Sequence, residues 1–592
     1  MATQVSGTLI TRNYTNFSGV DFSNRGDEVA LNHSPNALNM WKNYRSSNGK
    51  CVETRPDLDL LDSYPDEIYG MQFYTIDGTT YRMVHSGTNL YKDDEIIYSD
   101  MAEHKSNFFI FYDATTRNSK LYIMDTENFL VYDGTTIKDI EEVAYIPEVM
   151  ISMQPSGGGV KYQDINCLTP LRKNSFCADG TSTQYHLNAM TSFDDESATV
   201  ISTIDSDYTP KIWINGTQLT TGFTVNYNTA VVTFNTAPAA PLTAGQDNVV
   251  IQFKKTVTGL RDRIVKCPLV EIFDDRIFVS GNADYPNVLF HCELFDPSYF
   301  ASTVYYPEGS TDSKVTALVA GNNAIWVLKE PSQSNTTIFY HNPVIATVEG
   351  DTKNIKTYPS THSSISTGCK AKGINFNDSI VFFSDKGMES ITGDVTTEQV
   401  LIHRSSLVDT RLLNEEKYKD MQLVEWAGYL FVIMGNKAYL ADGNTLTQVN
   451  NHYEYEWFYF EFDKDISGAY VNDEILYLMS GNSIYTFTKT DTDIESYWTT
   501  VEDEFKYPQF QKTMNKKGFV IDMEGEELSV YVRTDEKDFQ LIKKYKNKKE
   551  YIVSKKKKKK WKSVQLKFYA TKPFSLYSNT LEAYVGSYVK RW

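Results

Sequence analysis

The chain has 592 residues with a net charge of −18, and 41% of them are hydrophobic, 23% charged and 14% aromatic. This balance excludes a disordered chain, and the large share of Tyr and Phe favours strands over helices. No apolar run approaches the ~18 residues of a bilayer span, and the first residues lack a signal-peptide pattern, so we expect a protein made in the cytosol without a membrane segment.

A short apolar strand, a turn with Gly, Asn or Asp, and a second strand rich in Tyr or Phe recur along the chain. The unit is found seven times, at residues 81–91, 121–132, 276–282, 324–340, 380–387, 430–439 and 475–485. Apart from one gap of 155 residues, the starts are 40 to 56 residues apart. Such a period, with a hairpin in each unit, predicts a β-propeller with six or seven blades of about four strands each.

Two of these strands are continuously apolar rather than alternating, Leu430–Met434 and Ile475–Met479. A strand has this pattern when both of its faces are covered. Because an isolated four-stranded sheet cannot cover both faces, the units are expected to stack on one another around a common axis.

The long gap predicts an insertion of β structure. Asn215-Gly216 is a strong hairpin signal, and it is followed by the strand-like segments 223–227, 230–234 and 249–253. A glycine-rich stretch at Pro155–Gly159 is typical of the approach to such a domain. We expect a small β-sandwich here.

Beyond about Tyr497 the pattern changes to clean alternation. Leu528, Val530 and Val532 share one face of a strand, and Val564, Leu566 and Phe568 share a face of another, which predicts a C-terminal sandwich with one solvated side. The predicted domains are therefore an N-terminal arm with the closing strand of the propeller (1–60), propeller (61–150), inserted sandwich (151–259), propeller (260–495) and C-terminal sandwich with a basic loop (496–592).

Known catalytic motifs are missing from the sequence, and no enzymatic activity, cofactor or metal is expected. The six cysteines are scattered without a CxxC pair, which favours reduced and mostly buried thiols. Ser384–Gly387 resembles part of the Asp-box turn of sialidase propellers, but Met388-Glu389 stands where that motif has Thr-Trp. Carboxylates could still converge at a propeller axis as in glycoside hydrolases, although the sequence singles out no pair.

The basic residues gather at the end of the chain. From residue 501 onward there are 22 Lys and Arg against 12 Asp and Glu, a balance of +10, which leaves −28 for the first 500 residues. The densest segments are Lys543–Lys549 and the run Lys555, Lys556, Lys557, Lys558, Lys559, Lys560 and Trp561. This run is either a solvated loop or a contact for an anionic partner, namely nucleic acid, an acidic neighbouring subunit or an anionic cell wall.

The N-terminal segments 31–41 and 49–56 resemble the opening of the nozzle or tubular-B proteins of short-tailed bacteriophages, also described as packaged-DNA stabilisation proteins. Further matches follow in the family's order at residues 282–291, 295–300, 325–330, 364–369 and 380–387. Residues 211–253 resemble small domains found on phage tails and fibres.

This resemblance implies a structural subunit of the virion tail, assembled in the host cytoplasm as a homo-hexameric ring. Such a ring continues the portal and adaptor channel, retains packaged double-stranded DNA and conducts it during ejection without sequence-specific binding. The implied partners are portal-side adaptor proteins and tail fibres or distal tail proteins. A closed ring needs a heterologous contact, and abundant tyrosine suits such wet interfaces.

Two other functions are compatible with the sequence. The first is a receptor-binding or carbohydrate-binding tail protein whose insert and C-terminal sandwich touch the host surface. The second is a propeller glycan hydrolase or lyase.

Overall fold

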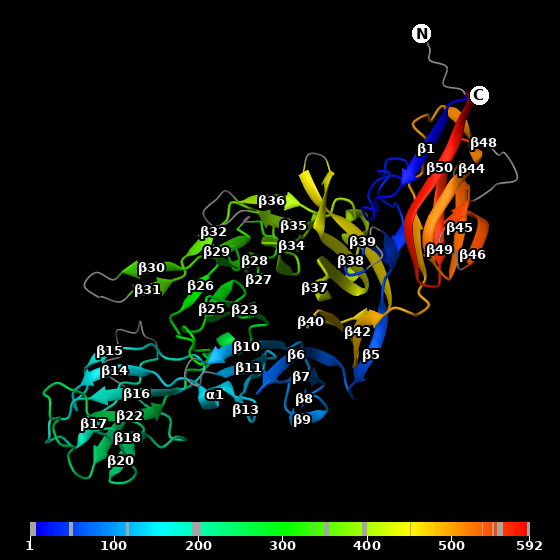
Figure 1. Ribbon diagram of the computed structural model, residues 1–592. Coiled ribbons are helices and arrows are strands. Elements are labelled where there is room, and N and C mark those ends of the chain that lie inside the picture. Colours follow the sequence, from blue (N-terminus) through cyan, green and yellow to red (C-terminus); the bar gives the residue numbers. More distant parts are fainter. Residues whose placement is uncertain are drawn as a thin grey trace. The chain divides into compact units, whose positions relative to one another are not determined.

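The computed structural model describes residues 7–46, 51–113, 118–191, 203–333, 336–347, 354–392, 399–449, 452–535, 537–546, 550–552 and 560–588 (Figure 1). The chain is an all-β protein, a propeller with an inserted sandwich and a C-terminal sandwich. It divides into two compact units, Met1–Ile68 with Ser364–Trp592, and Tyr69–Ser363. In the described ranges no helix has the length and apolar character needed to cross a membrane.

The second unit contains four antiparallel blades, each of four strands. The first is β6 (Ile68–Ile76), β7 (Thr79–Ser86), β8 (Asn89–Lys92) and β9 (Glu95–Tyr98), and the next is β10 (Asn107–Asp113), β11 (Asn118–Met124), β12 (Phe129–Tyr132) and β13 (Ile137–Asp139). After the insert come β23 (Leu269–Phe273), β24 (Arg276–Ser280), β25 (Val288–His291) and β26 (Tyr305–Pro307), then β27 (Val315–Gly321), β28 (Ala324–Lys329), β29 (Ile338–His341) and β32 (Ser360–His362). The short pair β30 (Val344–Thr347) and β31 (Asn354–Thr357) lies outside these sheets.

Consecutive blades of this unit pack face to face. Met83 and Leu90 of the first blade share a core with Leu121 and Ile123 of the second. In the same way Ile325 and Val327 share a core with strands β24 and β25, while every residue of β28 is buried. Both faces of the inner strands are covered, which is why these strands are apolar throughout.

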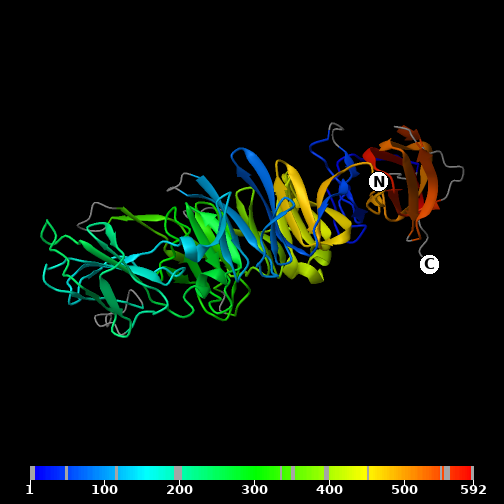
Figure 2. The ribbon, with the colours of Figure 1, turned by 90° about the horizontal axis from the view of Figure 1, so that it is seen from below.

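The insert forms two sheets and accounts for the 155-residue interval between the second and third repeats of the sequence (cyan to green in Figures 1 and 2). One sheet has the order β15 (Val160–Lys161), β14 (Glu148–Met153), β16 (Leu171–Phe176), β22 (Val249–Lys254), β18 (Lys211–Ile214) and β19 (Thr217–Leu219). The other contains β17 (Gln184–His186), β21 (Val231–Phe234) and β20 (Phe223–Asn226). Asn215 and Gly216 both have positive φ, 50° and 79°, as the expected hairpin turn requires. Helices α1 (Ile140–Val143) and α2 (Asp262–Val265) flank the insert in the chain.

The first unit holds the remaining blades. One is β33 (Gly373–Phe376), β34 (Ser379–Ser384), β35 (Gly387–Thr392) and β36 (Val400–His403), followed by α3 (Asp409–Leu412) and a 3₁₀ turn, Glu416–Asp420. The next consists of β37 (Gln422–Trp426), β38 (Tyr429–Val449) and β39 (His452–Ile466). The last is β40 (Gly468–Asn472), β41 (Ile475–Ser480) and β42 (Ser483–Lys489), completed by the early strand β5 (Asp57–Ser63).

The prediction of a hairpin at residues 430–439 is wrong. Strand β38 passes straight through it, and Gly435, with φ of 62°, marks a shift of register rather than a turn. The residues that follow, Ala438–Ala441, are all fully buried, so the strand must continue in order to cover them. Gly435 pairs with Ile466 and Lys437 with Glu461, so the extra residues of this irregularity lie on β39. The Gly-Asn pair of β38 looks like a turn in the sequence, although the strand continues through it.

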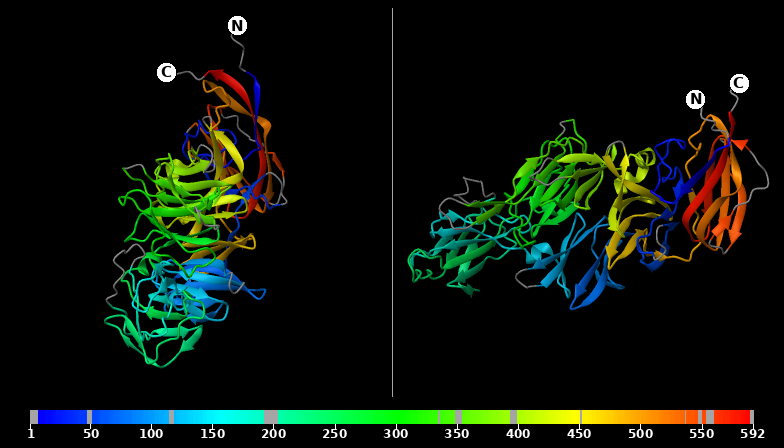
Figure 3. Two further views of the ribbon diagram at one scale, coloured as in Figure 1. Left: turned by 90° about the vertical axis from the view of Figure 1, so that its left-hand side faces the viewer. Right: turned by 45° about the horizontal axis from the view of Figure 1, so that its top comes forward.

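The C-terminal part contains β43 (Ser496–Thr499), β44 (Phe510–Gly525), β45 (Glu527–Thr534), β46 (Gln540–Lys546), β47 (Glu550–Ile552), β48 (Lys560–Trp561), β49 (Val564–Ala570) and β50 (Phe574–Tyr588). As expected, the alternating apolar residues of β45 and β49 are buried; Val530 pairs with Phe568, and Val532 with Leu566. Four N-terminal strands also join these sheets: β1 (Leu9–Tyr14), β2 (Ala37–Leu38), β3 (Met40–Trp41) and β4 (Val52–Thr54). Strands β1 and β50 lie side by side in Figure 1 and in the left view of Figure 3.

Candidate functional site at a strand junction

Two very short strands connect a blade to the C-terminal sandwich. Met40 of β3 pairs with Tyr459 of β39 on one side and with Thr54 of β4 on the other. Val52 of β4 in turn pairs with Leu576 of β50. The result is one ten-stranded sheet that runs from the blade β37–β39 into the C-terminal sandwich. Strand β2, just before β3, pairs instead with β43 in the facing five-stranded sheet.

Asn39 lies where the chain passes from one sheet to the other. Its φ of 55° is in the left-handed region, which Asn tolerates better than most residues. Its side-chain oxygen accepts hydrogen bonds from Arg55 Nε and from the backbone N–H of Glu461, both at 2.9 Å. Its amide donates to the carbonyl of Glu495 at 2.9 Å, so one buried side chain connects three segments.

Arg55 is the second polar anchor of this junction and is only 4% exposed. Beyond its bond to Asn39, it donates to the carbonyls of Pro56 (2.8 Å) and Glu461 (2.7 Å). Its guanidinium lies 4.9 Å from the ring centre of Phe462. Burial lowers the pKa of Arg55, while the nearby carboxylate of Asp57 raises it. A buried cation with this many acceptors fixes the positions of the strands around it.

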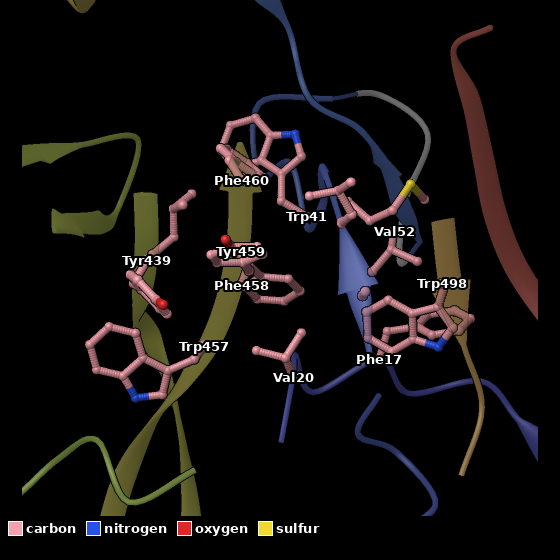
Figure 4. Close-up of a cluster of buried hydrophobic side chains, with 14 of the residues drawn as sticks. Phe17, Val20, Trp41, Val52, Tyr439, Trp457, Phe458, Tyr459, Phe460 and Trp498 are labelled. Carbon is pink, nitrogen blue, oxygen red and sulfur yellow. The ribbon is translucent and has the colours of Figure 1, made fainter. Parts of the chain in front are cut away.

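Buried aromatic side chains make up much of the hydrophobic core at this junction (Figure 4). The ring of Trp41 stacks on Trp426 at 5.8 Å and meets Phe460 edge-on at 6.1 Å. On the other side, Trp498 meets Phe17 edge-on at 5.2 Å. All of these side chains belong to one continuous core, so blade and sandwich share their interior as well as a sheet.

The Ser384–Gly387 turn lies beside a charged cluster. His403 contacts Asp409 through Nε2 at 2.7 Å and Glu389 through Nδ1 at 3.3 Å. Burial alone would lower the pKa of His403, but hydrogen bonds and charges from Asp409 and Glu389 raise it to about 10. A histidine that is protonated at neutral pH cannot act as a general base there.

Ser405 belongs to the same cluster, but its hydroxyl forms its hydrogen bonds with other groups than the imidazole of His403. Its hydroxyl donates to Asp409 Oδ1 at 2.6 Å and accepts from the backbone N–H of Met388 at 2.8 Å. A Cβ on Gly387 would lie 2.3 Å from the Ser405 hydroxyl, so glycine is required for the close approach. The cluster closes the turn, and the Ser384 hydroxyl rather than Asp385 accepts from the turn's Lys386 N–H.

Another paired acid and base is fully enclosed in the second unit. Glu308 Oε1 lies 2.9 Å from His341 Nε2, and both side chains are completely buried. Lys329 Nζ donates to the carbonyls of Glu308 and Ser310, each at 2.7 Å.

Among the described residues, no group of His, Cys, Asp and Glu is arranged to hold a metal ion. The six cysteines, all within the described ranges, form no disulfide bond, and five of them are buried.

Of the two basic segments, Lys543–Lys549 and the lysine tract Lys555–Lys560, only parts belong to the described residues. Lys543, Lys544 and Lys546 are exposed on β46. Lys555, Lys556, Lys557, Lys558 and Lys559 lie outside the described residues, whereas Lys560 is exposed. Trp561 is only 4% exposed and packs edge-on against Phe505 at 5.4 Å. Trp561 is thus a core residue where the chain re-enters the sandwich, and partner contact through the tract stays a prediction.

No protein-family model matches this sequence, and no curated protein matches it. Among solved structures, an exo-β-1,3-galactanase from Phanerochaete chrysosporium with bound galactose is 10% identical, with a TM-score of 0.21 over 53% of this chain and 95% of that chain. BBS1N in complex with ARL6DN is 8% identical, with a TM-score of 0.24 over 74% of this chain and 98% of that chain. Likenesses this weak carry no information on activity or partners.

Proposed function

We propose that this chain is a non-enzymatic structural subunit of a bacteriophage tail. In this proposal, copies form a homo-hexameric ring, the nozzle, which continues the portal and adaptor channel. The ring retains packaged DNA and conducts it during ejection. The sequence resemblance is the origin of the proposal, and the junction gives it a physical basis.

The main support for the proposal comes from the N-terminal segments that resemble the nozzle proteins. In the fold these segments form the junction between a blade and the C-terminal sandwich. Residues 31–41 and 51–56 supply Asn39, Trp41 and Arg55, which connect a blade to the C-terminal sandwich. A channel wall that resists the pressure of packaged DNA must not hinge between its parts. A continuous hydrogen-bonded sheet with a shared close-packed core meets that requirement, since close-packed interiors are hardly compressible.

The polar clusters support a structural role as well. His403 holds a turn closed in its protonated form, and the pair of Glu308 and His341 is enclosed in the core. Neither cluster combines an accessible base with a second catalytic group.

The test is assembly of the purified full-length chain, observed by negative-stain electron microscopy and native mass spectrometry. We expect closed rings of one stoichiometry, with antibody against the chain labelling the tails of intact phage particles. Monomers at all concentrations, together with unlabelled tails, would refute the proposal. Release of sugar from host glycans by the purified chain would favour the hydrolase instead.

A further inference from the structure

A pocket of about 390 Å³ lies where the inserted sandwich joins the chain segment that leads to α2, wholly within the second compact unit. Its wall is built from the start of β16, the end of β22 and the loop that leads from β22 into α2. The charged residues that line it are Arg172, Lys254, Lys255 and Arg261, with Glu141 and Asp262 opposing them. The lining thus brings four cations and two carboxylates together around one cavity.

Arg172 is the unusual member of the set, because it is a buried cation without a carboxylate partner among the described residues. It is 1% exposed, and its guanidinium donates to the carbonyls of Met190 and Lys255. These bonds occupy both terminal nitrogens, while Nε has no hydrogen-bond partner. Burial lowers the pKa of Arg172 to about 10, against the opposing effect of Asp205 and Asp164. Buried charges are normally paired, since an unpaired one is costly.

The other cations differ in how far they are neutralised. Lys254 forms an ion pair with Asp207 at 2.5 Å. Arg261 forms one with Asp139 at 2.7 Å, and its Nε lies 3.9 Å from Glu141 Oε2. Lys255 Nζ donates to the hydroxyl of Thr203 at 3.0 Å and has no ion pair within the described part of the chain. Arg172 and Lys255 are thus the two cations of the lining for which the described residues provide no ion pair.

We propose that this pocket binds the oxyanion, a phosphate or carboxylate group, of a small hydroxylated ligand such as an acidic sugar. Charge-assisted hydrogen bonds from cations bind oxyanions strongly. Here the half-buried Lys255 ammonium can supply them, while Arg172, whose terminal nitrogens are occupied, contributes its charge. The pocket volume suits a ligand of about one or two sugar rings. Thr169, Thr256 and Thr258 add side chains that carry hydroxyl groups to its wall. This ligand site goes beyond the structural role and does not depend on it.

The test is calorimetric titration of the full-length chain with glucose 6-phosphate, glucuronate, inorganic phosphate and glucose. We expect binding of at least one of the charged sugars and none of glucose. Preference for glucose 6-phosphate or for glucuronate identifies the group as phosphate or carboxylate, and inorganic phosphate shows whether the sugar contributes.

The variants Arg172→Gln and Lys255→Gln should each weaken that binding by about tenfold or more, because each removes a cation of the pocket lining that has no ion pair among the described residues. Lys255→Gln keeps the backbone carbonyl that Arg172 uses, so it remains informative if Arg172→Gln fails to fold. Lys314→Gln, an exposed lysine of the same unit outside the pocket lining, should leave binding unchanged. Equal binding of glucose, no binding of any probe, or equal loss in the Lys314 variant would overturn the proposal.

Discussion

At the scale of single residues, the junction depends on the geometry of one guanidinium. Arg55 reaches Asn39, Pro56 and Glu461 with three different nitrogens, whereas a lysine amine offers a single point of contact. We expect Arg55→Lys to lower the free energy of unfolding of the first unit by about 2 kcal/mol, since charged hydrogen bonds in the core are lost. Urea denaturation followed by tryptophan fluorescence measures this change. Arg45→Lys, at a side chain that is 41% exposed, is the control, and an equal effect of both would contradict the expectation.

His403 gives a second residue-scale prediction, on pH. Its pKa is raised from 6.5 to about 10 by Asp409 and Glu389, so the folded state holds this proton more tightly than the unfolded state. The stabilisation is complete below about pH 6.5 and disappears as the pH rises towards 10. We expect the melting temperature of the wild type to fall between pH 7 and 10 more steeply than that of His403→Gln. The exposed His186 provides the control as His186→Gln, and parallel curves for all three proteins would exclude the effect.

At the scale of elements, β1 shows how far apart in sequence the partners of a strand can be. All six of its residues pair with β50, and Arg12 and Tyr14 both bind Asp503, at 2.8 and 3.0 Å. Removal of residues 1–14 leaves β50 with one unpaired edge in this segment. We expect amide hydrogen exchange of residues 579–584 to accelerate, while strand β34 of a blade stays protected. Removal of residues 1–6 alone is the matched control, and unchanged protection of β50 after the longer deletion would contradict the pairing.

The local patterns predicted some elements better than others. Hairpins such as β7–β8 and β41–β42 are present because their turns carry Gly and their strands are apolar enough to be covered on both faces. Within β38 the strand residues were predicted but the turn was wrong, since Gly435 and Asn436 look the same in the sequence whether the chain turns or continues as a strand. Strands β3 and β4 were not predicted at all, because two or three residues are too few for any periodicity.

At the scale of the whole molecule, the separation of charge bears on assembly. The balance is +10 from residue 501 onward and −28 before it. If the lysine tract contacts an acidic neighbouring copy, replacing Lys555–Lys560 by glutamine should reduce ring formation, and the wild-type rings should weaken as salt increases. Sedimentation velocity at low and high salt measures both. Replacement of Lys543, Lys544 and Lys546 is the control, and rings that are indifferent to salt and to both changes would identify the tract as a solvated loop.

The sequence by itself determined the class of fold. Consecutive residues of a strand alternate between apolar and polar when one face is covered, and are apolar throughout when both faces are covered, so this information is local. It also indicated the inserted and the C-terminal sandwiches, whose turns and alternation are local signals. Only the tertiary structure decided which strands meet across hundreds of residues, as β4 does with β50, and which polar groups share a site, as Asn39 and Arg55 do. The same holds for the pocket around Arg172: its walls come from segments whose closeness depends on packing, and no local pattern records packing between distant segments.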